Sequence, residues 1–160
     1  ITLSDRAFKG IYADSSGELI QAQIADYFKD KNRLFDIKKT VLPDDAKALQ
    51  KAIKQALRLR TDLIITTGGT GIGSRDITIE TVRPFIQKEL VGIPEYIRNK
   101  YGQTNKHALL SRSLVGTHRQ SLVCCLPGSV KAVSEYMAEF LPMLDHTLAM
   151  IHDIDTPHGH

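Results

Sequence analysis

Short apolar runs alternate along this chain with stretches in which apolar residues recur at helical spacing. Apolar positions three and four residues apart share one face of a helix, whereas a short continuous apolar run suits a buried strand. We therefore expect strands at residues 1–3, 35–41, 63–67 and 121–126. Helices are expected at residues 16–31, 46–58, 92–101, 130–140 and 141–151. This alternation predicts an α/β fold.

Two prolines interrupt the helical patterns. Residues 79–86 have helical spacing, but Pro84 lacks the N–H group that a helix interior uses, so we expect a break or kink there. Pro142 is interpreted as marking the start of a separate last helix. We interpret residues 1–152 as a single domain and residues 153–160 as a polar, frayed C-terminal tail.

A glycine-rich run at residues 66–78 is the most informative feature of the sequence. It joins an expected strand to a helical segment and contains four glycines among threonines and a serine. Glycine allows a positive φ and close approach of the backbone to a ligand, and free N–H groups before a helix bind phosphates. Arg75 suits phosphate oxygens, and Asp76 suits a hydrated Mg²⁺. The run predicts a phosphate-handling site that carries a metal; a merely tight turn is the alternative.

Two well-known phosphate loops do not match this run. The dinucleotide-binding pattern Gly-x-Gly-x-x-Gly is absent because Gly71 and Gly73 are not followed by a third glycine at the required step. The P-loop pattern requires Gly-Lys followed by Ser or Thr, and the run contains no lysine. The site is therefore predicted to handle phosphate without either motif.

Three other polar loops are expected to converge with the glycine-rich run: residues 4–6 together with 14–17, residues 43–45 and residues 126–129. In an open α/β sheet, ligands bind beyond the carboxyl ends of the strands, where these loops lie. Each loop also has a structural alternative. Asp44 or Asp45, and likewise Ser129, are suitable helix N-caps. The remaining alternatives are a local ion pair between Asp5 and Arg6 and an exposed turn at Ser111 and Arg112.

Composition excludes several classes of protein. The chain has 160 residues and a formal net charge of +3, which is too balanced to indicate a nucleic-acid partner. No apolar run reaches the length of a transmembrane helix and no signal peptide is visible, so we expect no membrane partner and a cytoplasmic location. Balanced charge is still compatible with a local basic pocket for an anionic substrate.

Cysteine and histidine give no sign of a metal centre. Cys124 and Cys125 are neighbours in an expected strand, so their side chains point to opposite faces and are expected to be buried hydrophobic groups. The histidines have no zinc-site spacing, and no nucleophile elbow is present.

Several of these segments resemble the molybdenum-cofactor biosynthesis proteins, in particular the molybdopterin adenylyltransferase (MogA-type) branch. The strongest match is Thr-Gly-Gly-Thr-Gly at 67–71 followed by Arg-Asp-Ile-Thr at 75–78. The family usually has Pro after this Thr, where this chain has Ile79, a change that removes no functional group. Further matches occur in the same order along nearly the whole chain, at residues 4–7, 10–12, 42–45, 108–112 and 126–132.

The resemblance implies a three-layer α/β/α fold with a mostly parallel central sheet, assembled as a homotrimer. It implies an enzyme that transfers AMP from ATP to the terminal phosphate of molybdopterin, releases pyrophosphate and requires Mg²⁺. The product would pass to a molybdenum-inserting (MoeA-like) enzyme. A MoaB-type paralogue, which binds molybdopterin with weak or no turnover, is the alternative.

The resemblance also implies a set of site residues. Asp44 and Asp76 match the essential carboxylates and are assigned to catalysis and to Mg²⁺. Substrate and phosphate binding is assigned to Ser4, Asp5, Arg6, Thr67, Gly68, Gly69, Thr70, Gly71, Arg75, Ser111, Arg112, Pro127, Gly128 and Ser129. The metal-insertion branch carries Gly-Asp-Glu where this chain has residues 4–6, which disfavours that branch, and nothing in the sequence supports a scaffold role.

Overall fold

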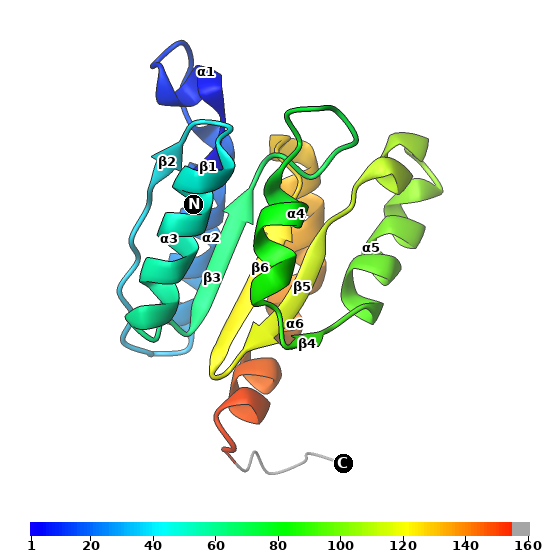
Figure 1. Cartoon of the computed structure of the whole chain (residues 1–160). Helices are drawn as coiled ribbons and strands as arrows, with labels where there is room; N and C mark the ends of the chain where they lie inside the picture. Colours follow the sequence, from blue (N-terminus) through cyan, green and yellow to red (C-terminus); the bar gives the residue numbers. More distant parts are fainter. Residues whose placement is uncertain (155–160) are drawn as a thin grey trace.

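A six-stranded sheet forms the centre of the computed structural model, which describes residues 1–154 (Figure 1). The strand order is β2-β1-β3-β6-β5-β4. The first four of these strands are parallel, and β5 runs antiparallel to both of its neighbours. The strands are β1 (Thr2–Leu3), β2 (Val41–Leu42), β3 (Leu63–Thr67), β4 (Lys88–Glu89), β5 (Leu114–His118) and β6 (Ser121–Leu126). The mostly parallel sheet is thus confirmed.

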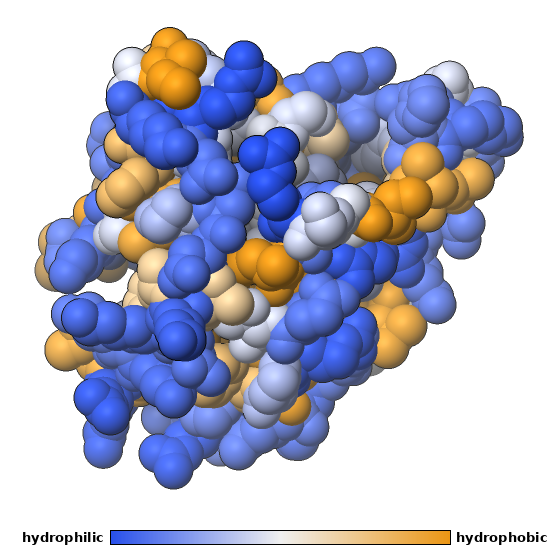
Figure 2. Space-filling view, turned by 45° about the horizontal axis from the view of Figure 1, so that its top comes forward, coloured by the Kyte–Doolittle hydropathy of each residue, from blue (hydrophilic) through white to orange (hydrophobic). Residues whose placement is uncertain are grey.

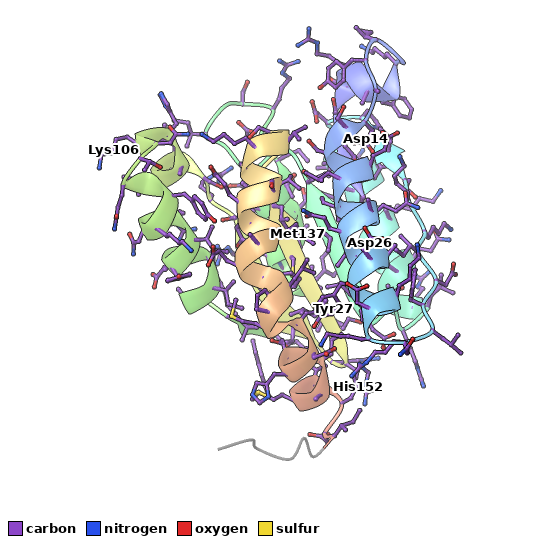
Figure 3. The ribbon with its side chains drawn as sticks, turned by 180° about the vertical axis from the view of Figure 1, so that it is seen from behind. Asp14, Asp26, Tyr27, Lys106, Met137 and His152 are labelled. Atoms are coloured by element: carbon purple, nitrogen blue, oxygen red, sulfur yellow. The ribbon has the colours of Figure 1, made fainter. Side chains whose placement is uncertain are left out.

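Helices cover both faces of the sheet. They are α1 (Asp5–Phe8), α2 (Ser15–Asp30), α3 (Ala46–Arg58), α4 (Thr78–Val82), α5 (Gly92–Gly102) and α6 (Val130–Ile151), with 3-10 helices η1 (Arg83–Phe85) and η2 (Lys106–Leu110). Helices α3 and α4 lie in front of the sheet in Figure 1, and α2, α5 and α6 cover its other face in Figure 3. This arrangement confirms the three-layer α/β/α fold.

Strand β6 separates two apolar clusters, one on each face of the sheet. Leu122, Cys124 and Leu126 face the cluster formed with α2, α5 and α6. Val123 and Cys125 face the cluster formed with α3 and α4. Successive side chains of a strand alternate between faces, so a strand covered on both sides has a continuous apolar sequence. This is why β6 and β3 have the bounds that the sequence predicts.

Strand β2 is much shorter than predicted. Residues 35–40 are not in a strand, and only Val41–Leu42 pairs with β1. β1 itself has two residues, so β2 has only two residues to pair with at this edge of the sheet. The predicted strand at 35–41 is therefore wrong except at its last residue.

Strand β5 is absent from the prediction. Its residues Leu114–Thr117 are buried, but Gly116 interrupts the apolar run. A methyl group at Gly116 would lie 2.4 Å from the Ile86 side chain and 2.7 Å from the Lys88 carbonyl oxygen, so glycine allows β4 to approach β5. β5 pairs along its whole length with the neighbouring β6, and glycine at 116 allows the two-residue β4 to pair on its other side.

Helix α6 is continuous where two helices are predicted. It runs from Val130 to Ile151 with Pro142 inside it. Met137, Phe140, Leu144 and Leu148 recur along one face and are buried in the same apolar cluster. Burial of this face on both sides of the proline outweighs the missing N–H group. By contrast, Pro84 does end α4, which gives way to η1, as predicted.

The end of the chain lies partly outside the description. The predicted tail covers residues 153–160, of which 155–160 are outside the described residues. Across residues 1–154, none of the helices has the length and apolar character needed to span a membrane.

Candidate functional site

The carboxyl ends of β1, β3 and β6 open onto one cavity of about 690 Å³. Its walls come from the segments that follow β1, β2, β3 and β6, as expected for an open α/β sheet. Figure 2, which turns this end toward the viewer, shows a largely hydrophilic surface with separate apolar patches. The predicted residues that line the cavity are Ser4, Asp5, Arg6, Asp44, Thr67, Gly68, Gly69, Arg75, Asp76, Gly128 and Ser129.

Two glycines allow the backbone to turn sharply after β3. Gly68 has φ +98°, and a methyl group there would lie 2.3 Å from the Leu3 carbonyl oxygen. Gly69 has φ +65°, and a methyl group there would lie 2.4 Å from the Thr78 hydroxyl. That hydroxyl donates to the Gly68 carbonyl at 2.7 Å. The start of the glycine-rich run is thus held against β1 and the first residue of α4.

The middle of the run has backbone donors available to a ligand. Within residues 1–154, the N–H groups of Gly69, Thr70 and Gly71 donate no hydrogen bond to the protein. An N–H group without a protein partner needs water or an anion. Gly69 lines the cavity, so its N–H is suited to bind a phosphate oxygen there, whereas Thr70 and Gly71 lie outside the lining.

The Asp76 carboxylate folds back onto its own loop. Its Oδ2 accepts from the Gly73 N–H at 2.8 Å. A methyl group at Gly71 would lie 2.8 Å from the same oxygen, so glycine at this position makes room for the carboxylate. Asp76 therefore closes the loop and also lines the cavity.

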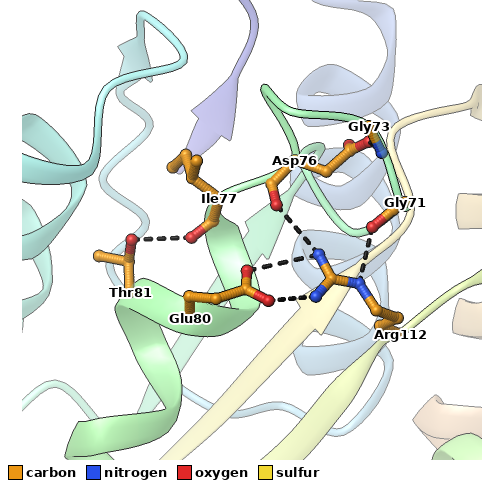
Figure 4. A network of polar contacts seen from close by, with 7 residues as sticks. All are labelled: Gly71, Gly73, Asp76, Ile77, Glu80, Thr81 and Arg112. Carbon is orange, nitrogen blue, oxygen red and sulfur yellow. Dashed lines mark hydrogen bonds and ion pairs between the residues drawn. The ribbon is translucent and has the colours of Figure 1, made fainter.

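Arg112 holds the glycine-rich run from outside the cavity (Figure 4). Its Nε donates to the Gly71 carbonyl at 2.7 Å, and its Nη2 donates to the Asp76 carbonyl at 3.0 Å. The same guanidinium forms an ion pair with Glu80 on α4, and hydrogen bonding from Arg112 holds the pKa of Glu80 below its usual value. Arg112 is not among the residues that line the cavity, so the structure places it as a support for the loop.

Ser111 lies beside Arg112 in the same supporting position. Its hydroxyl is 3.5 Å from the Thr70 hydroxyl, and the Arg112 N–H donates to the Thr70 carbonyl at 2.9 Å. Neither Ser111 nor Thr70 lines the cavity. The segment that precedes β5 therefore contacts the loop through its outer side.

Asp5 and Asp44 are paired across two strands. The Asp44 N–H donates to Asp5 Oδ1 at 3.1 Å, and the Asp5 N–H lies 3.4 Å from Asp44 Oδ2. Arg75 Nη1 lies 3.9 Å from Asp5 Oδ2. The structure thus brings together the segments after β1 and β2 and the glycine-rich run.

The structure decides which aspartate caps α3. Asp45 Oδ1 accepts from the Ala48 N–H at 2.7 Å, the usual N-cap hydrogen bond. Asp45 does not line the cavity, whereas Asp44 does. The cap role left open for either residue belongs to Asp45.

The segment after β6 combines capping with contacts to neighbouring loops. Ser129 caps α6 by accepting from the Ala132 N–H at 3.2 Å, and it also lines the cavity. The Pro127 carbonyl accepts from the Thr67 hydroxyl at 2.7 Å, while Pro127 itself lies outside the lining. The Gly128 carbonyl accepts from the Ser16 hydroxyl at 2.7 Å. These hydrogen bonds tie β3, β6 and α2 together around the cavity.

Several lining residues were not predicted as site residues, among them Tyr12 and Asp14. Asp14 caps α2, accepts from the Thr2 hydroxyl at 2.8 Å and lies 3.9 Å from Lys39 Nζ. Their sequence signals are their place in the loop after the first strand and, for Tyr12, the family resemblance at residues 10–12. Asp14 therefore fixes the loop from which Tyr12 extends.

The two cysteines are buried, as predicted. Burial raises the pKa of the Cys124 thiol and raises that of Cys125 to about 12. Such thiols are not nucleophilic near neutral pH. Within residues 1–154, no group of three or more His, Cys, Asp or Glu side chains is arranged to hold a metal ion by itself.

These features define an open α/β domain with a cavity, lined by polar loops, at the carboxyl ends of its parallel strands. The family model described as "Probable molybdopterin binding domain" matches residues 1–146. The chain belongs to this family, which includes the MogA and MoaB molybdenum-cofactor biosynthesis proteins.

Individual relatives agree with this assignment. The chain is 33% identical over 152 residues to molybdopterin adenylyltransferase of Helicobacter pylori, covering 94% of this chain and 85% of that protein. It is 36% identical over 157 residues to gephyrin of Dictyostelium discoideum; 94% of this chain matches, but only 22% of gephyrin's length. A solved structure of the tungsten cofactor synthesizing protein MoaB from Pyrococcus furiosus matches with TM-score 0.82 and 32% identity, covering 96% of this chain and 94% of that one.

Proposed function

We propose that this chain is a molybdopterin adenylyltransferase, which transfers AMP from ATP to the terminal phosphate of molybdopterin and releases pyrophosphate. The observation that carries the proposal is the convergence of Asp44, Asp76, Arg75 and the free Gly69 N–H at one cavity. The adenylyltransferase relative, of which 85% is covered, supports it.

The proposed reaction needs positioning more than a strong base. A phosphate monoester has its second pKa near 6, so it is already nucleophilic at neutral pH. One of its oxygens forms a bond to the α-phosphorus of ATP, while the bond from that phosphorus to pyrophosphate breaks. The chain's part is to hold the phosphates with the Gly69 N–H and with Arg75, both at the cavity wall.

The lining residues fit Mg²⁺, which the proposal includes. Mg²⁺ takes oxygen ligands, usually one or two carboxylates together with substrate phosphates and water. Asp5, Asp44 and Asp76 supply carboxylates at the cavity, but within residues 1–154 they form no complete metal site without a substrate. Bound together with ATP, Mg²⁺ would neutralise phosphate charge; Asp44 and Asp76 are the residues proposed to hold it.

A MoaB-type binder with weak or no turnover is the second candidate. It is favoured by the match to the MoaB structure from Pyrococcus furiosus, which is as similar to this chain as the adenylyltransferase relative. Both candidates include assembly as a homotrimer, which light scattering would test. For the enzyme, the product is proposed to pass to a molybdenum-inserting (MoeA-like) partner.

The deciding experiment follows adenylyl-molybdopterin and pyrophosphate formed from molybdopterin, ATP and Mg²⁺. Asp44→Asn and Asp76→Asn should each lower kcat by roughly 100- to 1000-fold, the usual effect of removing one group that stabilises developing charge. Asp45→Asn is the matched control, because it is the adjacent carboxylate, lies outside the lining and keeps a good N-cap. Tight molybdopterin binding without product would favour the binder, and neither binding nor product would reject both candidates.

A further inference from the structure

The segment between β1 and α2 contributes an aromatic ring to an otherwise polar cavity. Helix α1 lies in this segment and projects beyond the carboxyl ends of the strands (Figures 1 and 3). Among the lining residues, which all belong to the described part of the chain, Tyr12 is the only aromatic one. Tyr12 is 49% exposed, so a large part of its surface is available for contact.

The ring is held in position by its neighbours. The Tyr12 hydroxyl lies 2.9 Å from Ser4 Oγ, and Ser4 in turn caps α1 by accepting from the Ala7 N–H at 3.2 Å. The Arg6 guanidinium carbon lies 5.4 Å from the ring centroid, within the range of a cation–π contact. A ring fixed in this way loses little conformational freedom when a ligand binds.

Both substrates of the proposed reaction carry a fused nitrogen heterocycle with a flat pyrimidine ring in addition to phosphate. Flat heterocycles of different kinds stack on aromatic side chains and on guanidinium groups, because each has a π-face. The glycine-rich run accounts for phosphate but offers no such surface. Tyr12 with Arg6 supplies one at the same cavity.

We propose that Tyr12, together with Arg6, is the binding surface for the planar heterocycle of a substrate, while the glycine-rich run binds its phosphates. This inference rests on the proposed function. It divides the cavity into a phosphate end and a ring end, so that each substrate is held at two points. The shared chemistry is a fused nitrogen heterocycle, and separate measurements with ATP and molybdopterin identify which of the two rings stacks there.

The test uses binding to the Tyr12→Leu, Tyr12→Phe and Phe8→Leu variants. Phe8 is the matched control, since it belongs to the same segment and is 54% exposed but does not line the cavity. The probes are ATP, molybdopterin and inorganic tripolyphosphate, which has no ring. Tyr12→Leu should weaken binding of ATP or molybdopterin by roughly 5- to 100-fold. Tripolyphosphate binding should not change, and Phe8→Leu should bind all three probes almost as the unmodified chain does. Tyr12→Phe, which keeps the ring but loses the contact with Ser4, should bind ATP or molybdopterin more tightly than Tyr12→Leu does.

A spectroscopic signal separates stacking from a structural role. If adenine stacks on Tyr12, its ring protons shift upfield on binding; the shift should persist in Tyr12→Phe and disappear in Tyr12→Leu. Loss of ATP affinity assigns adenine to the surface, and loss of molybdopterin affinity assigns the pterin. Unchanged affinity for both in Tyr12→Leu overturns the inference, as does an equal loss for tripolyphosphate. If the unmodified chain binds neither ATP nor molybdopterin, the proposed function itself fails, and the inference fails with it.

Discussion

Two regions of this molecule gather polar side chains around a hollow, and they are built in opposite ways. The first is the cavity at the carboxyl ends of the strands, whose walls come from four loops joined by hydrogen bonds. The second is a shallow hollow of about 540 Å³ on the exposed side of α3, which we call the lysine face. The lysine face consists of Lys47, Gln50, Lys51, Lys54, Gln55 and Arg58.

The comparison shows that charge density alone does not define a site. The four cations of the lysine face recur one turn apart on a single helix, and within residues 1–154 none of them forms an ion pair. Ordering such long side chains around a ligand costs conformational entropy. The cavity instead presents backbone groups that folding has already fixed. We therefore expect function to depend on the loops of the cavity and to be insensitive to the lysine face.

Glycine substitutions should give the largest effect. Gly68→Ala combines a positive φ with a methyl group 2.3 Å from backbone, so we expect a loss of about 2–4 kcal/mol in the free energy of unfolding. Gly10→Ala has a positive φ but open space, and should cost about 1–2 kcal/mol. Gly92→Ala has neither problem and should change stability by less than about 1 kcal/mol.

Urea unfolding of the three variants measures this order directly. Activity should be lost in Gly68→Ala even where the protein remains folded, because the turn after β3 carries the N–H groups of the loop. Equal destabilisation by Gly68→Ala and Gly92→Ala would show that the loop adapts freely, and the contrast with the lysine face would then weaken.

Removing the support of the loop should give the next largest effect. Arg112→Ala deletes the donors to the Gly71 and Asp76 carbonyls, so we expect kcat/KM to fall roughly 10- to 100-fold, the effect of a small displacement of a catalytic loop. Arg83→Ala is the control, because Arg83 also pairs with a glutamate, Glu89, but does not contact the loop.

Arg112→Lys should recover only part of the activity, since a lysine cannot reproduce the planar set of donors. Steady-state kinetics with both substrates checks this. An Arg112→Ala variant with the kinetics of Arg83→Ala would mean that the loop keeps its shape without support, contrary to the view of the cavity as a braced structure.

The main elements of the cavity could be predicted from the sequence because their signals are local. The continuous apolar runs of β3 and β6 have the predicted bounds, and the glycine-rich run follows β3 directly. Loops at the carboxyl ends of parallel strands share one edge of the sheet, so their convergence follows from topology.

The remaining features depend on contacts between distant parts of the chain. Arg112 is 41 residues from Gly71, and nothing near Arg112 in the sequence indicates that it supports the loop from outside. The choice between Asp44 and Asp45 as the helix cap is decided by backbone geometry, because both are aspartates and their side chains are equally suited to capping. β5 was missed although it forms a hairpin with the neighbouring β6, because Gly116, which makes room for the distant β4, interrupts its apolar pattern.

A smaller, pH-dependent effect should come from the Arg112–Glu80 pair. Arg112 lowers the pKa of Glu80 from its ordinary value of 4.5, so the folded state favours the carboxylate. The ion pair with Arg112 therefore stabilises the folded state. This stabilisation is fully present above pH 4.5 and is lost as the pH falls through the lowered pKa of Glu80. Unfolding of the unmodified chain and of Glu80→Gln should therefore differ at neutral pH, and the difference should shrink on acidification. A difference that grows as the pH falls would contradict this sign.

Neutralising the lysine face should have the smallest effect. Replacing Lys47, Lys51, Lys54 and Arg58 by Gln removes four positive charges from a chain whose net charge is +3. Like charges one turn apart repel by a few tenths of a kcal/mol, so α3 should be unchanged or slightly more stable. At physiological salt, the charges are screened over about 8 Å, and kcat/KM should stay within about twofold. A larger fall that persists at high salt would show that this helix contacts a substrate directly, and the distinction between a preorganised cavity and a solvated charged face would fail.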